Sequence, residues 1–201
     1  MPHKRKTLLV FATTIICLLL TPLAARAKTC DSPATPTYTD AQIADRLQEI
    51  NERYDLYEPM SAEDAAFVQE YATPVGSPAT RGSSSFSWTK SGGGTQVTVT
   101  GNVYHNGTLS YTWGANMDVA TISGPTPRSM VARVQCTAYG VLGDNLYGKI
   151  YDRTVSRTYS NTRSFHYAPA VNYSGVAAVY SVNASVDVTT SNGSFFTVTG
   201  N

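Results

Sequence analysis

Apolar and polar residues alternate with a period of two along most of the chain from residue 82 onward, and this pattern restricts the fold more than any other feature. Successive side chains of a β-strand point to opposite faces, so alternation predicts strands with one buried and one solvent-facing side. Residues 82–200 contain about eight such segments separated by turn signals. We therefore expect a mainly β domain over residues 82–201, either an antiparallel β-sandwich or a barrel-like domain.

Two of these segments, around residues 130–138 and 176–188, show the alternation along their length. Each has one apolar face, and the residues between the apolar ones are mostly polar. Asn192-Gly193 is expected to turn the chain into a last strand at 195–199. The predicted inward-facing residues are Val176, Ala178, Tyr180, Val182, Ala184, Val186 and Val188 in the later segment, and Met130, Ala132, Val134, Cys136 and Ala138 in the earlier one.

The segment 97–119 predicts a hairpin around Asn106-Gly107. A two-residue turn there would place the apolar face of one strand against the polar face of the other, because a slip of one residue exchanges the faces. We therefore predict a three-residue turn at 105–107 with a bulge, which pairs Val103 with Leu109 and Val99 with Trp113.

Residues 39–73 have a helical pattern instead. Thr39 and Gln42 match a capping box, and Ser61 begins a second helix. The two predicted stripes consist of Ile43, Leu47, Ile50 and Tyr54, and of Ala65, Val68, Tyr71 and Ala72. Pro59 and Pro74 should end the helices. We expect an acidic helical arm at 39–73, after a flexible lead-in at 28–38 and before a linker at 74–81.

The first 27 residues resemble a secretory signal peptide. A basic stretch at 4–6 precedes thirteen mostly apolar residues at 8–20, and Ala25-Arg26-Ala27 has the small residues of a cleavage site. The apolar run is shorter than the ~20 residues that span a bilayer. We therefore expect cleavage after Ala27, a secreted, extracellular protein and no transmembrane anchor once the signal is removed.

The charges are unevenly distributed. The whole chain has a formal net charge of +1. Residues 28–73 hold ten acidic and three basic residues, a net charge of −7, whereas residues 74–201 hold eight basic and four acidic residues, a net charge of +4. Specific binding to nucleic acid is not expected from this balance.

A strand predicted over residues 147–157 carries basic and aromatic side chains on one face, and further aromatic residues follow it. Cations bind phosphate or sulfate groups and rings provide flat surfaces, so this pattern suits an anionic polymer. It is also compatible with a solvated strand face, or with a surface on which the acidic arm docks. The candidate ligand-binding residues are Tyr147, Lys149, Tyr151, Arg153 and Arg157.

Two cysteines remain after the predicted signal, Cys30 and Cys136. An exported protein can keep a disulfide, and a Cys30–Cys136 bond would tie the lead-in to the β domain. The apolar face of Cys136 favours the alternative, a buried free thiol.

No motif for catalysis or for metal or cofactor binding is present. His105 lies in the predicted turn, His166 lies in a Phe-His-Tyr sequence, and neither belongs to a known catalytic motif. Two cysteines and two histidines without short spacing do not form a zinc site. We expect no cofactor, no metal and no enzymatic activity.

Three functions are compatible with these features. The first is a secreted, non-enzymatic β-domain protein that binds a surface polymer, a glycan or a protein through the basic and aromatic strand face. The second is an effector or membrane-active toxin from which the acidic helical arm is removed as a pro-segment. The third is a secreted hydrolase, which requires His105 or His166 near a serine and a carboxylate in a pocket.

Overall fold

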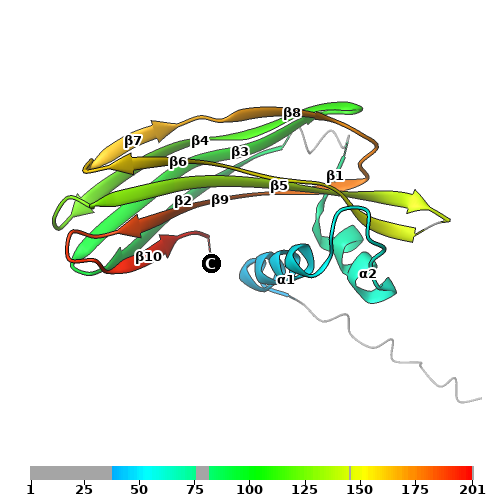
Figure 1. Cartoon of the computed structure of the whole chain (residues 1–201), viewed down its shortest axis with the longest axis horizontal. Helices are drawn as coiled ribbons and strands as arrows, with labels where there is room; N and C mark the ends of the chain where they lie inside the picture. The colour runs from blue at the N-terminus through cyan, green and yellow to red at the C-terminus, as the bar shows by residue number, and fades with distance from the viewer. Residues whose placement is uncertain (1–37, 76–81, 145, 201) are drawn as a thin grey trace, which may run out of the picture. The chain divides into compact units, whose positions relative to one another are not determined.

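The structure is a computed structural model that describes residues 38–75, 82–144 and 146–200. The predicted signal peptide, Cys30 and most of the lead-in and linker lie outside these residues. Two antiparallel sheets and two helices make up the described part (Figure 1). No helix within it is both long and apolar enough to cross a membrane.

The first sheet contains the strands that carry most of the predicted alternation. Its order is β1, β9, β5 and β6, and β10 pairs with β9 beside β1. The bounds are β1 (Thr73–Pro74), β5 (Ser129–Gly143), β6 (Leu146–Ser160), β9 (Val179–Thr189) and β10 (Phe195–Val198).

The second sheet contains the predicted hairpin. Its order is β2, β3, β4 and β7, and β8 also pairs with β4. No described strand joins the two sheets into a closed barrel, so the sandwich is the correct one of the two expected architectures. The bounds are β2 (Gly82–Gly92), β3 (Thr95–Gly107), β4 (Ser110–Ser123), β7 (Ser164–Tyr167) and β8 (Ala170–Ser174).

The main core lies between the two sheets, where the alternation predicted it. The inward-facing residues of β5, from Met130 to Ala138, are completely buried, as are Trp113 and Val99 of the facing sheet. The prediction fails only before β9 begins, because Val176 is 77% exposed. Alternation therefore identifies the buried face of each strand, but not where the strand starts.

The hairpin between β3 and β4 has the predicted face-to-face pairing but a different turn. Val103 pairs with Ala115 and Val99 with Val119, and Gly107 lies opposite Tyr111. The turn therefore comprises residues 108–110, and the predicted pairing of Val103 with Leu109 is wrong. The register differs from the prediction by an even number of positions, so the apolar faces still meet.

The helices begin where the capping signals predict. In α1 (Asp40–Arg53), Thr39 and Gln42 form the capping box, and in α2 (Ala62–Tyr71) the Ser61 hydroxyl caps the first turn. α1 ends well before Pro59, with Tyr54 as its C-cap. Proline therefore marks the latest possible end of the helix rather than its actual end.

The helical arm packs on the outer face of the first sheet through a second apolar cluster. Leu47 and Ile50 of α1 and Val68 of α2 contact Tyr139 of β5 and Tyr147 of β6. The backbone adds to this contact, since Met60 N–H donates to the Tyr147 carbonyl at 2.8 Å. The arm and the sandwich belong to one compact unit.

Candidate binding surface

A bulge divides the predicted basic and aromatic stripe between the two faces of the first sheet. Ala138 pairs with Tyr151, but the next residue, Tyr139, pairs with Lys149, so Ile150 is the extra residue of β6. Tyr151, Arg153 and Arg157 lie opposite inward-facing residues of β5, whereas Tyr147 and Lys149 lie on the outer face. The prediction that all of these residues share one face is wrong, because a bulge shifts the alternation by one residue.

Tyr147 and Lys149 are buried beneath the helical arm. The Lys149 ammonium donates to the carbonyl oxygen of Asn51 at the end of α1, at 2.9 Å, and it pairs with Asp152 at 3.2 Å. Tyr147 belongs to the cluster that holds the arm on the sheet. Both residues therefore have structural contacts and are not available to an external ligand.

Tyr151 points into the sandwich. Its ring stacks on Tyr173 of β8 with centroids 4.0 Å apart, and its hydroxyl accepts a hydrogen bond from Trp113 Nε1 at 3.1 Å. Tyr151 thus joins the two sheets near their open side.

Arg153 and Arg157 are the members of the stripe that remain exposed. The Arg157 guanidinium lies 5.3 Å from the centre of the Tyr159 ring, which stacks on Phe165 of β7 with centroids 3.8 Å apart. Neither arginine forms an ion pair within the described residues. We call Arg153, Arg157, Tyr159 and Phe165 the arginine edge.

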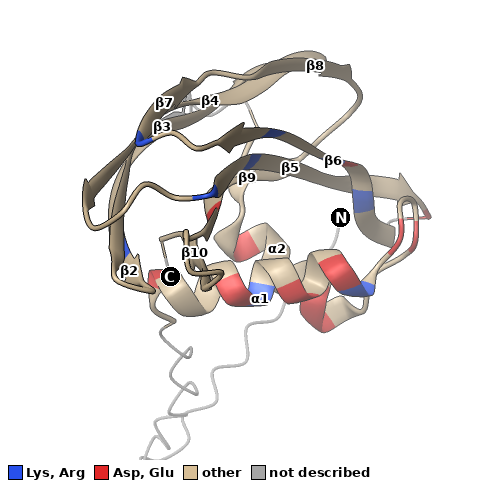
Figure 2. Cartoon of the chain, turned by 60° about the vertical axis from the view of Figure 1, so that its left-hand side comes forward, with Lys and Arg blue, Asp and Glu red and all other residues tan. Residues whose placement is uncertain are grey.

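The acidic arm does not neutralise the arginine edge. Asp64 is 2% exposed and accepts hydrogen bonds from Arg46 at 2.6 Å and Arg53 at 2.8 Å, and Glu49 pairs with the same two arginines. Acidic positions concentrate on the two helices, while lysines and arginines lie along the strands (Figure 2). The arm thus docks on part of the stripe, since it covers Tyr147 and Lys149, whereas Arg153 and Arg157 stay exposed.

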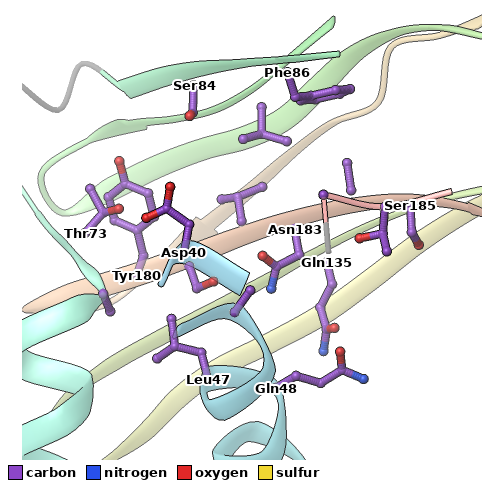
Figure 3. Close-up of a pocket in the computed structure, with 18 of the residues that line it drawn as sticks. Asp40, Leu47, Gln48, Thr73, Ser84, Phe86, Gln135, Tyr180, Asn183 and Ser185 are labelled. Carbon is purple, nitrogen blue, oxygen red and sulfur yellow. The ribbon is translucent and has the colours of Figure 1, made fainter. Parts of the chain in front are cut away.

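A cavity that no sequence pattern predicted lies on the other open side of the sandwich. We call this cavity of about 900 Å³ the hollow. Asp40 and Gln48 of α1 lie on one side, Phe86 of β2 on the opposite side, and Asn183 and Ser185 of β9 between them (Figure 3). These segments are far apart in the chain, so no local pattern could predict that they meet.

His105 is buried rather than exposed in a turn. Its ring stacks on Tyr180 with centroids 3.8 Å apart, and Nε2 lies 2.8 Å from the Tyr173 hydroxyl. Burial lowers the pKa of His105 to about 4, so the ring is neutral at pH 7. It has no carboxylate partner in the described residues, and its contacts are those of a core residue.

His166 lies on the outer face of the second sheet. Its Nδ1 is 2.9 Å from Asp118 Oδ1 on the neighbouring strand, and Ser164 lines the same shallow depression. No hydrogen bond from Ser164 to His166 occurs in the described residues. His166, Asp118 and Ser164 thus meet the spatial condition of the hydrolase hypothesis, but the contact that activates a serine nucleophile is not formed among these described residues. The hypothesis stays a prediction.

Cys136 is a free thiol, completely buried between the sheets. Burial, with the nearby Asp152 carboxylate, raises the pKa of the thiol far above its usual range, so it is unreactive in the folded state. The partner proposed for a disulfide, Cys30, lies outside the described residues.

The described residues contain no group of three or more histidine, cysteine or acidic side chains that could hold a metal ion. The chain matches no family model, and a search of curated proteins found no match.

Proposed function

We propose that this protein is an exported, non-enzymatic binding protein whose arginine edge binds an anionic polymer. The observation that carries the proposal is the pair of exposed guanidinium groups, Arg153 and Arg157, beside a stacked aromatic pair and without a carboxylate partner. Signal-directed export is part of the proposal and rests on the sequence of residues 1–27.

The chemistry of the arginine edge suits phosphate or sulfate groups. A guanidinium presents several N–H donors in a plane and binds such groups through two parallel hydrogen bonds. The stretch from Arg153 to Val186 contains no acidic residue, so no carboxylate of this segment opposes an approaching anion. The Tyr159–Phe165 pair provides a flat surface beside the cations.

A sulfated polysaccharide is a suitable probe. We expect the protein to be retained on heparin-agarose at low salt and released as salt screens the charges. The double variant Arg153→Ala/Arg157→Ala should elute at clearly lower salt. The matched control, Lys90→Ala/Arg133→Ala, removes the same charge from β2 and β5 and should elute near the wild type.

The control separates position from net charge. Equal losses of retention in the two double variants would show that only the overall charge matters and would refute a site at the arginine edge. Absence of retention of the wild type at low salt would refute binding to anionic polymers.

A further inference from the structure

The outer edge of β9 is paired at both ends but not in the middle. β1 pairs with residues 179–180 and β10 pairs with residues 186–189, while β5 covers the whole of the other edge. No described strand pairs with residues 181–185 on the outer edge. This leaves a gap of five residues in the sheet, between two strands that run in line with each other.

The hydrogen bonds at both ends of the gap show which backbone groups are left without a partner. At one end, Thr190 N–H donates to the Ser194 carbonyl at 2.9 Å. At the other end, just before β9 begins, the Ala178 carbonyl accepts from Val75 N–H at 2.8 Å, while the Ala178 N–H donates to the Tyr139 carbonyl of β5 at 2.8 Å. In an antiparallel ladder every second residue bonds to the same neighbour, so the even-numbered residues of β9 face the outer edge. Val182 and Ala184 therefore direct two N–H and two C=O groups into the gap.

The gap opens into the hollow, whose lining includes Val182, Asn183 and Ala184 of β9. On the inner side the hollow is lined by Phe86 and Trp88, whose rings stack with centroids 4.1 Å apart, and by Val103. On the outer side the lining is mixed, since Asn183 and Gln48 lie there together with Ala44 and Leu47. A strand in the gap would thus have alternate side chains in an apolar and in a mixed, partly polar environment.

One other exposed edge of the first sheet carries features that oppose pairing. β6, the edge strand on the far side of the first sheet, has a bulge and carries Arg153 and Arg157. Charged side chains and bulges protect edge strands from unwanted partners. The gap in β9 lacks both, since residues 181–185 are Ser-Val-Asn-Ala-Ser in a continuous register with β5.

We propose that the gap binds an extended segment of another polypeptide, which adds a short strand antiparallel to β9 and pairs with Val182 and Ala184. The segment has apolar side chains opposite Val182 and Ala184, polar side chains on either side of them, and no proline among its five paired residues. This proposal is independent of the arginine edge and uses the opposite open side of the sandwich.

The size of the gap identifies the type of occupant. β1 and β10 close it at both ends, so a bound segment must turn away after about five residues. The exposed edges of a second copy are longer strands, such as the 11-residue β2 and the 15-residue β6. Residues 33–37 precede the arm, but they contain Pro33 and Pro36, which have no N–H to donate.

The experiment is selection of a phage-displayed library of random heptapeptides on the purified protein, followed by measurement with the synthesised consensus peptide. We expect a consensus with apolar residues at alternate positions. Ala184→Pro removes one N–H that faces the gap and should weaken binding about tenfold or more. Asn183→Pro instead removes an N–H that faces β5, so it should lower the melting temperature, whereas Ala184→Pro should not.

Hydrogen exchange tests the wild type without any substitution. The amides of Val182 and Ala184 should exchange faster than those of Ser181, Asn183 and Ser185, and the peptide should slow exchange at these two positions. Failure to select any heptapeptide, or binding that leaves the two amides unchanged, would overturn the proposal. Binding only after deletion of residues 28–37, or concentration-dependent protection without peptide, would assign the gap to this chain's own segment or to a second copy and would also overturn it.

Discussion

His105 and Asp64 show how burial of single titratable side chains makes the stability of this fold depend on pH. His105 is held neutral between Tyr180 and Tyr173. Burial raises the pKa of Asp64, but hydrogen bonds with Tyr54 and Ser61 and the charges of Arg46 and Arg53 outweigh it, so the pKa is lowered. Because the pKa of each residue is lower in the folded chain, acid destabilises the fold through both of them. The loss in the free energy of unfolding occurs in a different pH range for each residue.

The contribution of His105 should be lost between pH 6.5 and about 4. In the unfolded chain His105 binds a proton at the usual pKa near 6.5, whereas in the folded chain its pKa is about 4. Between pH 6.5 and 4, the free energy of unfolding of the wild type should therefore fall by about 3 kcal/mol more than that of His105→Phe. Urea unfolding of both proteins at several pH values measures the difference, and parallel pH curves would contradict it.

The contribution of Asp64 should be lost at lower pH. A carboxylate with a lowered pKa stabilises the folded state above its unfolded pKa, near 3.9, and this contribution disappears as pH falls through the folded value. We expect Asp64→Asn to lower the free energy of unfolding by about 2 kcal/mol at pH 7, with a smaller difference below pH 4. Glu49→Gln, at an exposed pairing residue, is the control and should change little in the same unfolding experiment.

The Tyr147 hydroxyl should be dispensable. It is buried under the arm and has no hydrogen-bond partner within the described residues. Tyr147→Phe removes a buried polar group without changing the ring and should leave stability unchanged or raise it by about 1 kcal/mol. Tyr173→Phe removes a hydroxyl bonded to His105 and should lower stability by about 1 kcal/mol. Thermal unfolding of the two variants compares them, and destabilisation by Tyr147→Phe would contradict the structure.

At the level of elements, alternation predicts faces better than it predicts registers. The buried faces of β5 and β9 follow directly from the sequence, because burial selects apolar residues at every second position. The β3–β4 register does not, because every even shift keeps the apolar faces together. The observed shift places His105 opposite Trp113, and this packing depends on Tyr173 and Tyr180 from distant strands.

Two neighbouring substitutions distinguish the observed hairpin from an Asn-Gly turn. Gly107 has a φ of 117°, and a Cβ there would lie 2.0 Å from the Ser110 carbonyl oxygen. Gly107→Ala should therefore lower stability by about 2 kcal/mol. Asn106 is exposed and pairs with Thr112 within the ladder, so Asn106→Ala should change stability by less than about 0.5 kcal/mol. Equal losses for both variants in chemical unfolding would favour a turn at Asn106-Gly107.

The bulge in β6 decides which of the candidate site residues are exposed. The sequence predicted the strand and its composition, and Arg153 and Arg157 are exposed as a binding surface requires. Tyr147 and Lys149 were misplaced because one extra residue moved them to the other face. Gly140 and Gly148, which pair beside the bulge, were the available signal, since glycine within a strand often accompanies a bulge.

For the whole molecule, charge separation in the sequence did not predict how the parts pack. One interpretation had the acidic arm dock on the basic sheet. The arm does pack on that sheet, but mainly through apolar contacts, and Arg46 and Arg53 of the arm itself pair with its central carboxylate, Asp64. The arm's position leaves the arginine edge on one open side of the sandwich. The hollow on the other side depends on how segments far apart in the chain are arranged in space, and no pattern within one segment contains that information.

The affinity of the protein for soluble heparin, measured at several salt concentrations, tests the proposed function most directly. Binding through Arg153 and Arg157 predicts a dissociation constant that rises steeply with salt, and a weaker dependence for Arg153→Ala/Arg157→Ala than for Lys90→Ala/Arg133→Ala. A wild-type affinity that does not change with salt, or equal salt dependence in the two double variants, would contradict it.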